Sequence, residues 1–446
     1  MFELKWEWES APGLSVASHA QTWCRLEMRV EEVVATRVED RASRGYRDGI
    51  YLPLMPLAEW LVGCWWFLLY EGPQHERVVG GRRAASHERA WFARHNWLFA
   101  REGYALPDLT LVRVDDDLMW IGQVADPVQG ERYPVRFTAE YQRVLPRREV
   151  VEGLRTLLDA VADRVGASPD EEAVAFVARW RELSALTGDD RTLRERAAAL
   201  GLDGDDPAEV DEALASSLVY GFNDIPPVLV PELLAGALVT ELESRAQRVR
   251  ALRSGAPAEP HTGALDIARQ RLELPALMAS DAEAYRVGWK LAERFRARVL
   301  RDESPGVAEA LQQRLGDTEL LTLVRANAPT GDDAIRGWVS AAATGSAPVV
   351  LAPTGTEATR FLCARALGLA LQGRRERLIT DAATYSQRVS RAFATELLAP
   401  LSFVQSRVTR STVTQAQLLA IAAEAGVQPR VVQHQIENHR LATVVE

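Results

Sequence analysis

The sequence predicts an α+β protein that is mostly helical, and three observations lead to this prediction. Apolar and charged residues alternate in the stretch 4–9 (LKWEWE), which is typical of a strand near the N-terminus. From residue 147 onward, apolar residues recur at helical spacing over most of the chain. The short apolar run 349–351 (VVL) indicates a buried strand, so we expect a small sheet within a helical C-terminal part.

Residues 1–146 are expected to form an α+β domain that is rich in tryptophan, because nine of the twelve tryptophans lie in the first 120 residues. The stretch 54–70 is apolar on every side, which predicts a buried helix. Asp115–Asp117 is a turn signal between two apolar stretches and predicts a hairpin. Strands are expected at 4–9, 23–38, 109–114, 118–124 and 135–141.

Residues 147–330 are expected to form a helical middle region. The apolar residues of 147–165 follow i, i+3, i+4 spacing and predict one amphipathic helix. Ser168 is the expected cap of the next helix, with Pro169 in its first turn. The segment 254–263 (SGAPAEPHTG) is the best linker candidate. Residues 331–446 are expected to form a third, mostly helical domain with a small sheet.

Composition narrows the function classes. The chain has 446 residues and a net charge of −10, which argues against broad nucleic-acid binding but leaves room for a local basic patch. Its three cysteines cannot build a disulfide framework, which favours a reducing compartment. The N-terminus lacks a signal-peptide pattern, and the longest apolar run is about half of the ~20 residues that a membrane span needs. We therefore expect a cytoplasmic protein that does not contact a membrane.

The most informative stretch is 356–372 (TEATRFLCARALGLALQ). It resembles the active-site helix of the ImmA/IrrE-type zinc metallo-endopeptidases, in which an Arg-Phe pair precedes Ala-His-Glu-Leu-Gly-His. The segments 392–400 (AFATELLAP) and 418–442 resemble the family's second helix and its C-terminal helix pair. The resemblance covers roughly 335–446 and implies a zincin-like domain. The residues of 356–372 that match are Arg360, Phe361, Ala364, Leu367 and Gly368.

The resemblance also implies a zinc site whose chemical groups this chain lacks. The family's first histidine is Arg365, its glutamate is Ala366 and its second histidine is Leu369. The third ligand would stand at Val389. A guanidinium has no lone pair for zinc, and alkyl groups can neither bind the metal nor accept a proton. We therefore expect no catalytic residue, metal or cofactor, and a salt bridge from Arg365 to a nearby carboxylate.

A replacement metal site is the alternative to this loss. Asp381, Glu396 and Glu357 lie near these positions in sequence, and three carboxylates could hold a hard cation. The competing interpretation is that Glu396 is structural and the other two carboxylates are solvated.

The preferred functional hypothesis is a catalytically inactive ImmA/IrrE-like pseudo-peptidase that acts as a protein-binding regulator or adaptor. Active family members, as the resemblance implies, cleave a helix-turn-helix repressor in phage, mobile-element or stress responses. The partner would then be a helix-turn-helix regulator or a subunit of a defence complex. The expected partner-binding cleft contains Arg360, Arg365 and Glu396.

Two other hypotheses remain open at this point. One is an active endopeptidase that uses non-standard ligands to cleave a repressor-like protein. The other is a DNA-binding transcriptional regulator, because the stretch 418–439 has the spacing of a helix-turn-helix motif. Its recognition helix would carry Arg430, Gln433 and Gln435.

Overall fold

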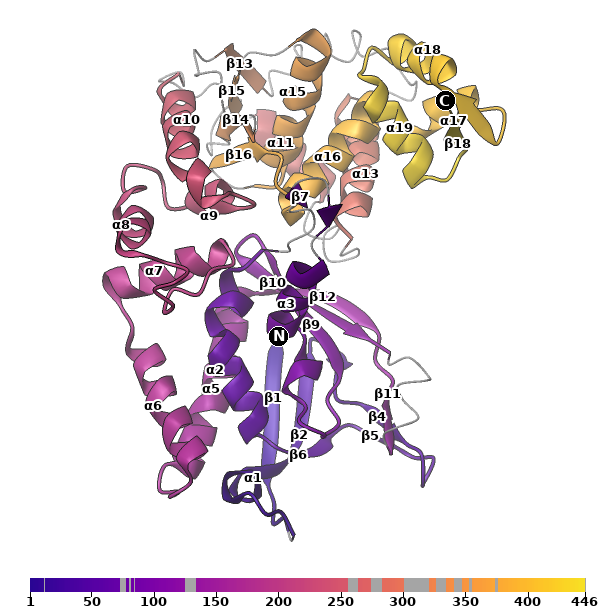
Figure 1. Ribbon diagram of the computed structural model, residues 1–446. Helices are drawn as coiled ribbons and strands as arrows, with labels where there is room; N and C mark the ends of the chain where they lie inside the picture. Colours follow the sequence, from indigo (N-terminus) through magenta and orange to yellow (C-terminus); the bar gives the residue numbers. More distant parts are fainter. Residues whose placement is uncertain are drawn as a thin grey trace. The chain divides into compact units, whose positions relative to one another are not determined.

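The protein folds into two compact units, Met1–Val219 and Tyr220–Glu446, and each is described here by itself. The computed structural model contains 53% helix and 20% strand, which confirms the α+β class (Figure 1). Of the expected linker 254–263, residues 256–263 lie outside the described part. The structure describes residues 1–11, 13–72, 78–79, 82–83, 85–124, 134–255, 264–273, 283–300, 321–325, 334–340, 347–352, 355–373 and 376–445.

The strands of the first unit form small antiparallel sheets. In the first sheet, β1 (Phe2–Trp8), β2 (Trp23–Val30) and β3 (Val33–Val34) pair in order, and β6 (Ile50–Pro53) also pairs with β2. The predicted hairpin is confirmed, because Val114 pairs with Asp117 across the turn. The other sheets contain β9 (Asp108–Val114), β10 (Asp117–Gln123) and β12 (Tyr141–Pro146); β4 (Val38–Asp40), β5 (Tyr46–Arg47) and β11 (Val135–Phe137); and β7 (Val78–Val79) and β8 (Arg82–Arg83).

Helices α2 (Met55–Tyr70) and α5 (Arg147–Val165) share one hydrophobic core with strands β1, β2, β6, β9 and β10. The buried helix expected at 54–70 and the amphipathic helix expected at 147–165 are both confirmed. Gly153 lets α5 approach the Phe2 ring, where an added Cβ would lie 2.6 Å from Cδ1. The other helices of this unit are α1 (Ala17–Gln21), α3 (Ala85–His95), η1 (Trp97–Ala100), α6 (Glu171–Ala185), α7 (Gly188–Ala199) and most of α8 (Glu212–Tyr220).

The cap predicted for helix α6 is wrong. The N-cap is Asp170, whose carboxylate accepts hydrogen bonds from the backbone N–H of Glu172 and of Ser18. Ser168 lies before the helix and is buried. An aspartate at this position serves better because its negative charge also meets the positive end of the helix dipole.

The second unit is built on one four-stranded sheet in the order β13 (Leu321–Arg325), β15 (Ala347–Leu351), β14 (Ile335–Ser340), β16 (Glu376–Thr380). The strand expected at 349–351 lies in β15, but β13 and β16 are strands where helix or turn was expected. Helices α10 (Leu242–Ser254) and α15 (Thr356–Leu371) both contact this sheet, and Figure 1 shows them on either side of it.

Helix α16 (Tyr385–Leu398) packs between α15 and α13 (Ala284–Phe295). Gly288 of α13 makes the approach to α16 possible, because an added Cβ would lie 2.6 Å from the Val389 carbonyl oxygen. No helix in the described part of the chain is long and apolar enough to cross a membrane. The remaining elements are α9 (Val230–Leu234), η2 (Val239–Glu241), α11 (Ala264–Leu272), η3 (Arg296–Leu300), α17 (Leu401–Arg407), β17 (Thr412–Thr414), α18 (Gln415–Ala425), α19 (Pro429–Asn438) and β18 (Thr443–Val445).

Candidate functional site

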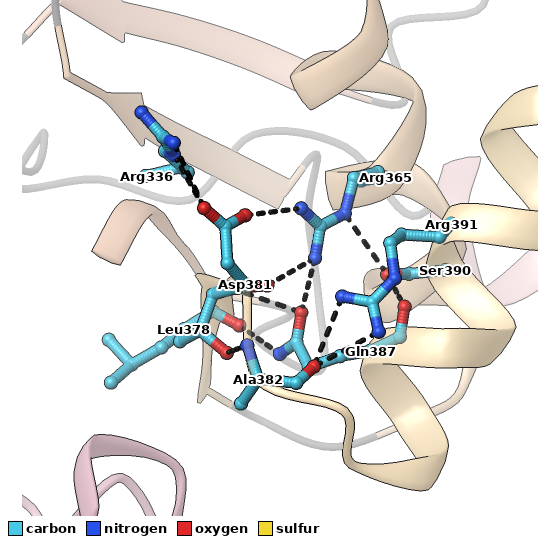
Figure 2. Close-up of polar contacts among 9 residues, drawn as sticks. Arg336, Arg365, Leu378, Asp381, Ala382, Gln387, Ser390 and Arg391 are labelled. Atoms are coloured by element: carbon cyan, nitrogen blue, oxygen red, sulfur yellow. Dashed lines mark hydrogen bonds and ion pairs between the residues drawn. The ribbon is translucent and has the colours of Figure 1, made fainter. Parts of the chain in front are cut away.

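Arg365 lies at the centre of a buried polar cluster where α15, β16 and α16 meet (Figure 2). Its side chain is only 2% exposed. Nη2 donates to the Thr380 carbonyl oxygen at 2.6 Å and to Gln387 Oε1 at 2.7 Å. Nε donates to Ser390 Oγ at 3.4 Å. The guanidinium therefore joins the three elements through hydrogen bonds.

The predicted salt bridge of Arg365 is confirmed with Asp381. Nη1 of Arg365 lies 3.8 Å from Asp381 Oδ1, which is an ion-pair distance and too long for a hydrogen bond. The other oxygen, Oδ2, accepts from Arg336 Nη2 at 2.9 Å and from Nε at 3.1 Å. Asp381 is half exposed, so this carboxylate links the buried cluster to the surface.

Gln387 and Ser390 of α16 complete the cluster, and sequence reasoning missed both. Gln387 Nε2 donates to the Leu378 carbonyl oxygen at 2.7 Å, and its Oε1 also accepts from the Thr380 N–H at 3.2 Å. Ser390 Oγ donates to the Gln387 carbonyl oxygen at 2.9 Å. The available signal was their spacing, since polar residues at i and i+3 share one helix face beside apolar neighbours.

The charges around Arg365 are mainly positive. The pKa of Arg365 is lowered to about 9, mainly by burial and in part by the charges of Arg391 and Arg336, and Asp381 acts in the opposite direction. Arg391 lies beside the cluster and donates from Nη1 and Nη2 to the Ala382 carbonyl oxygen at 3.0 and 3.1 Å. The guanidinium of Arg365 remains protonated at neutral pH, and its charge is only partly balanced by Asp381.

These positions do not fit the zinc that the family resemblance implies. Arg365 already donates to three oxygen acceptors and offers no lone pair. Ala366, Leu369 and Val389 are buried and apolar, so they supply neither a ligand nor a proton acceptor. Among the described residues, no group of three or more His, Cys, Asp or Glu side chains is arranged to hold a metal ion.

The three carboxylates of the alternative cation site have separate environments. Glu396 is buried, where it accepts from the Leu401 N–H at 3.1 Å and from Gln435 Nε2 at 2.7 Å. Burial raises the pKa of Glu396 to about 7, although these two hydrogen bonds act against the rise. Asp381 belongs to the Arg365 cluster, and Glu357 is exposed in the first turn of α15. The structural role considered for Glu396 is the one that the structure supports.

The other expected contact residues do not converge on Arg365. Arg360 Nη1 donates to the Gly426 carbonyl oxygen at 3.3 Å, at the corner between α18 and α19. In the segment 418–439, where a DNA-recognition helix is one hypothesis, Arg430 is exposed and Gln433 is half-buried. Gln435 is fully buried and donates to Glu396 and to the Ala399 carbonyl oxygen, so it cannot reach a nucleic acid. The expectation for Gln435 is therefore wrong, because this side of α19 faces the core.

No protein-family model, curated protein or solved structure matches the chain. The resemblance to the ImmA/IrrE-type peptidases therefore remains a prediction from three motifs. The functional argument depends on the geometry of the Arg365 cluster.

Proposed function

We propose that this protein is a non-catalytic, ImmA/IrrE-like pseudo-peptidase that acts by binding a protein partner. The observation that carries the proposal is the buried guanidinium of Arg365, which stands where the family's first zinc-binding histidine would be. It donates to Thr380, Gln387 and Ser390, so three buried oxygens hold the arginine side chain at this position.

The side chains at the other three positions of the family's zinc site support the same proposal. Leu369 and Val389 are buried in a continuous apolar core, and Ala366 has no side-chain acceptor for the proton of an attacking water. A hydrolytic site would need polar groups at each of these positions. The polar groups are absent from all of these positions, yet α15 and α16 still pack together. This combination favours a scaffold that binds a partner and does not cleave it.

Metal analysis of the purified full-length chain, freed of any affinity tag, tests the loss of catalysis. We expect no stoichiometric zinc after dialysis without a chelator, and no shift in melting temperature when zinc or a chelator is added. Zinc retained at one equivalent per chain would contradict the proposal and favour an active peptidase with non-standard ligands.

Partner binding needs a separate experiment. The full-length chain is used as bait in its native host, and each captured protein is purified and mixed with it again. We expect a stable complex in which the partner keeps its length after prolonged incubation with added divalent metals. Chelator-sensitive cleavage of the partner would contradict the non-catalytic assignment.

A further inference from the structure

The guanidinium of Arg365 has one nitrogen, Nη1, that makes no hydrogen bond to the described residues. Nε and Nη2 donate to Ser390, Gln387 and Thr380, whereas the described partner of Nη1 is Asp381, in an ion pair at 3.8 Å. Figure 2 shows Nη1 directed toward the Asp381 carboxylate. A 2%-exposed charged group with an incompletely used donor can gain from a closer anionic partner.

The resident anion shows which chemistry this position accepts. Asp381 is a carboxylate that is half exposed, and it contacts Arg336 through Oδ2 and Arg365 through Oδ1. Because Nε and Nη2 are occupied, an incoming anion meets one nitrogen of Arg365, and the position of Asp381 shows that a carboxylate oxygen can lie beside it. Asp381 therefore shows what kind of group can bind beside Nη1, and it competes with an incoming carboxylate for that position.

The electrostatic environment favours a further negative charge. Arg391 and Arg336 both act on Arg365 as like charges, and among the described groups Asp381 is the one charge that opposes them. Arg336 and Arg391 take part in other interactions as well, so the inference depends on the nitrogen that Arg365 presents.

We propose that Arg365, with Arg336, Asp381 and Arg391 around it, recognises a carboxylate in an acidic segment of the partner protein. This inference rests on the proposed partner-binding function and names the chemistry of the partner. The incoming carboxylate takes the place of Asp381 beside Nη1 of Arg365, and Asp381 limits the affinity by occupying that place first.

Calorimetric titration of the full-length chain with a short glutamate-rich peptide with blocked ends tests the inference. The same peptide with glutamine in place of glutamate measures the contribution of charge, and inorganic phosphate measures the response to a different anion. The key variant is Asp381→Asn, which removes the competitor and leaves the buried guanidinium in place. Asp224→Asn is the matched control, because Asp224 is also an exposed partner of an arginine and the net charge changes equally.

We expect the glutamate peptide to bind saturably and the glutamine peptide not to bind. Asp381→Asn should tighten binding about fivefold, as expected for the loss of one exposed opposing charge, and Asp224→Asn should leave the affinity unchanged. Arg336→Gln should weaken binding, which places the peptide at this cluster.

Three results would overturn the inference: no peptide binding to Asp381→Asn, equal tightening by Asp224→Asn, or tighter binding of phosphate than of the peptide. Circular dichroism of each variant confirms that it is folded. Zinc content and partner cleavage are measured independently, so a negative titration with a zinc-free protein that binds its partner would reject only this inference.

Discussion

At the residue scale, Arg365 shows how the surroundings make a buried charge tolerable. Moving a guanidinium out of water costs several kcal/mol unless hydrogen bonds and an opposite charge replace the lost hydration. Here two side-chain acceptors, one backbone carbonyl and one carboxylate provide that replacement. If the arginine were removed, these buried oxygens would lose the hydrogen bonds that it donates, and Gln387 Oε1 would keep only the one from the Thr380 N–H among the described groups.

Arg365→Met is therefore expected to destabilise the second unit by about 3 kcal/mol, because it leaves buried acceptors at Thr380, Gln387 and Ser390 without their donor. Arg365→Lys should cost less, since it keeps a charge and part of the bonding. Urea unfolding measures both changes. Arg388→Met, at an exposed position on the same α16, is the control and should change stability by at most about 0.5 kcal/mol. Equal effects at positions 365 and 388 would contradict the role of the cluster.

Glu396 gives a pH-dependent prediction, because burial raises its pKa from the ordinary value of 4.5 to about 7. The stabilisation linked to its protonated form is complete below pH 4.5 and is lost as pH rises toward 7. Glu396→Gln should remove this loss. The difference in unfolding free energy between variant and parent should therefore shift in favour of the variant by about 2–3 kcal/mol from pH 4 to pH 8.

The new amide of Glu396→Gln also has an acceptor available, because Oε1 of Gln435 is buried without a hydrogen bond in the described part of the chain. Turning over the Gln435 amide would pair the two side chains, but it would also break the hydrogen bond from Nε2 to the Ala399 carbonyl oxygen, which offsets part of the gain. Urea unfolding across this pH range measures the difference in slope. Glu357→Gln, at an exposed carboxyl, should leave the pH dependence as it is, and an unchanged slope in Glu396→Gln would contradict the argument.

At the element scale, the contact between α13 and α16 depends on the absence of a side chain at Gly288. An added Cβ would lie 2.6 Å from the Val389 carbonyl oxygen and 2.8 Å from the Phe393 backbone nitrogen. Backbone atoms cannot rotate away as a long side chain can, so the two helices would have to separate. The position of α16, and with it the Arg365 cluster, is fixed in part by this contact.

Gly288→Ala should accordingly destabilise the second unit by about 1–3 kcal/mol despite the better helix propensity of alanine. Gly63→Ala in α2 is the comparison, because an added Cβ there has no atom within 4 Å. That change should stabilise the first unit by up to about 1 kcal/mol. Thermal unfolding followed by circular dichroism gives both values, and a neutral Gly288→Ala would disprove the close contact.

The sequence predicted helices better than the short strands of the second unit. Helix 147–165 has six apolar residues at regular spacing and was predicted to the residue. Strand β16 is only five residues long and buries Arg377 and Thr380 together with apolar residues, so it lacks the alternation that marks a half-exposed strand. Strand β13 is equally short, and the tertiary pairing with β15 determines its conformation.

At the scale of the whole molecule, the chain contains two compact units that each have a hydrophobic core. Helix α5 shares the core of the N-terminal strands, so the change in composition near residue 146 does not coincide with a change of core. Composition records which residues are used, whereas a unit is defined by which residues pack together.

Separate expression of 1–219 and 220–446 should give two folded proteins. Cooperative thermal unfolding and near-ultraviolet circular dichroism measure their tertiary packing. The fragment 220–446 should keep the sensitivity to Arg365→Met, because every described partner of Arg365 lies within it. Loss of cooperative unfolding in either fragment would show that the units depend on each other.

The candidate site was predictable only in part. The motif comparison singled out Arg365 and its pairing with a nearby carboxylate. It could not find Gln387, Ser390 or Arg336, because these residues reach the cluster only through the pairing of β14 with β16 and the packing of α15 on α16. The spacing of Gln387 and Ser390 places them on one helix face, but it does not show which residue that face packs against.

The hydrogen bonds of Arg365 also constrain how the second unit can assemble. A slip of α16 by one turn against α15 would move Ser390 and Gln387 away and, in one direction, bring Arg391 and Ala394 to their places. In such a mispacked state the buried guanidinium would lack the acceptors of Gln387 and Ser390, at a cost of several kcal/mol. The hydrogen bonds of this one arginine therefore favour a single alignment of α15 and α16 over neighbouring alignments that hydrophobic contacts alone would allow.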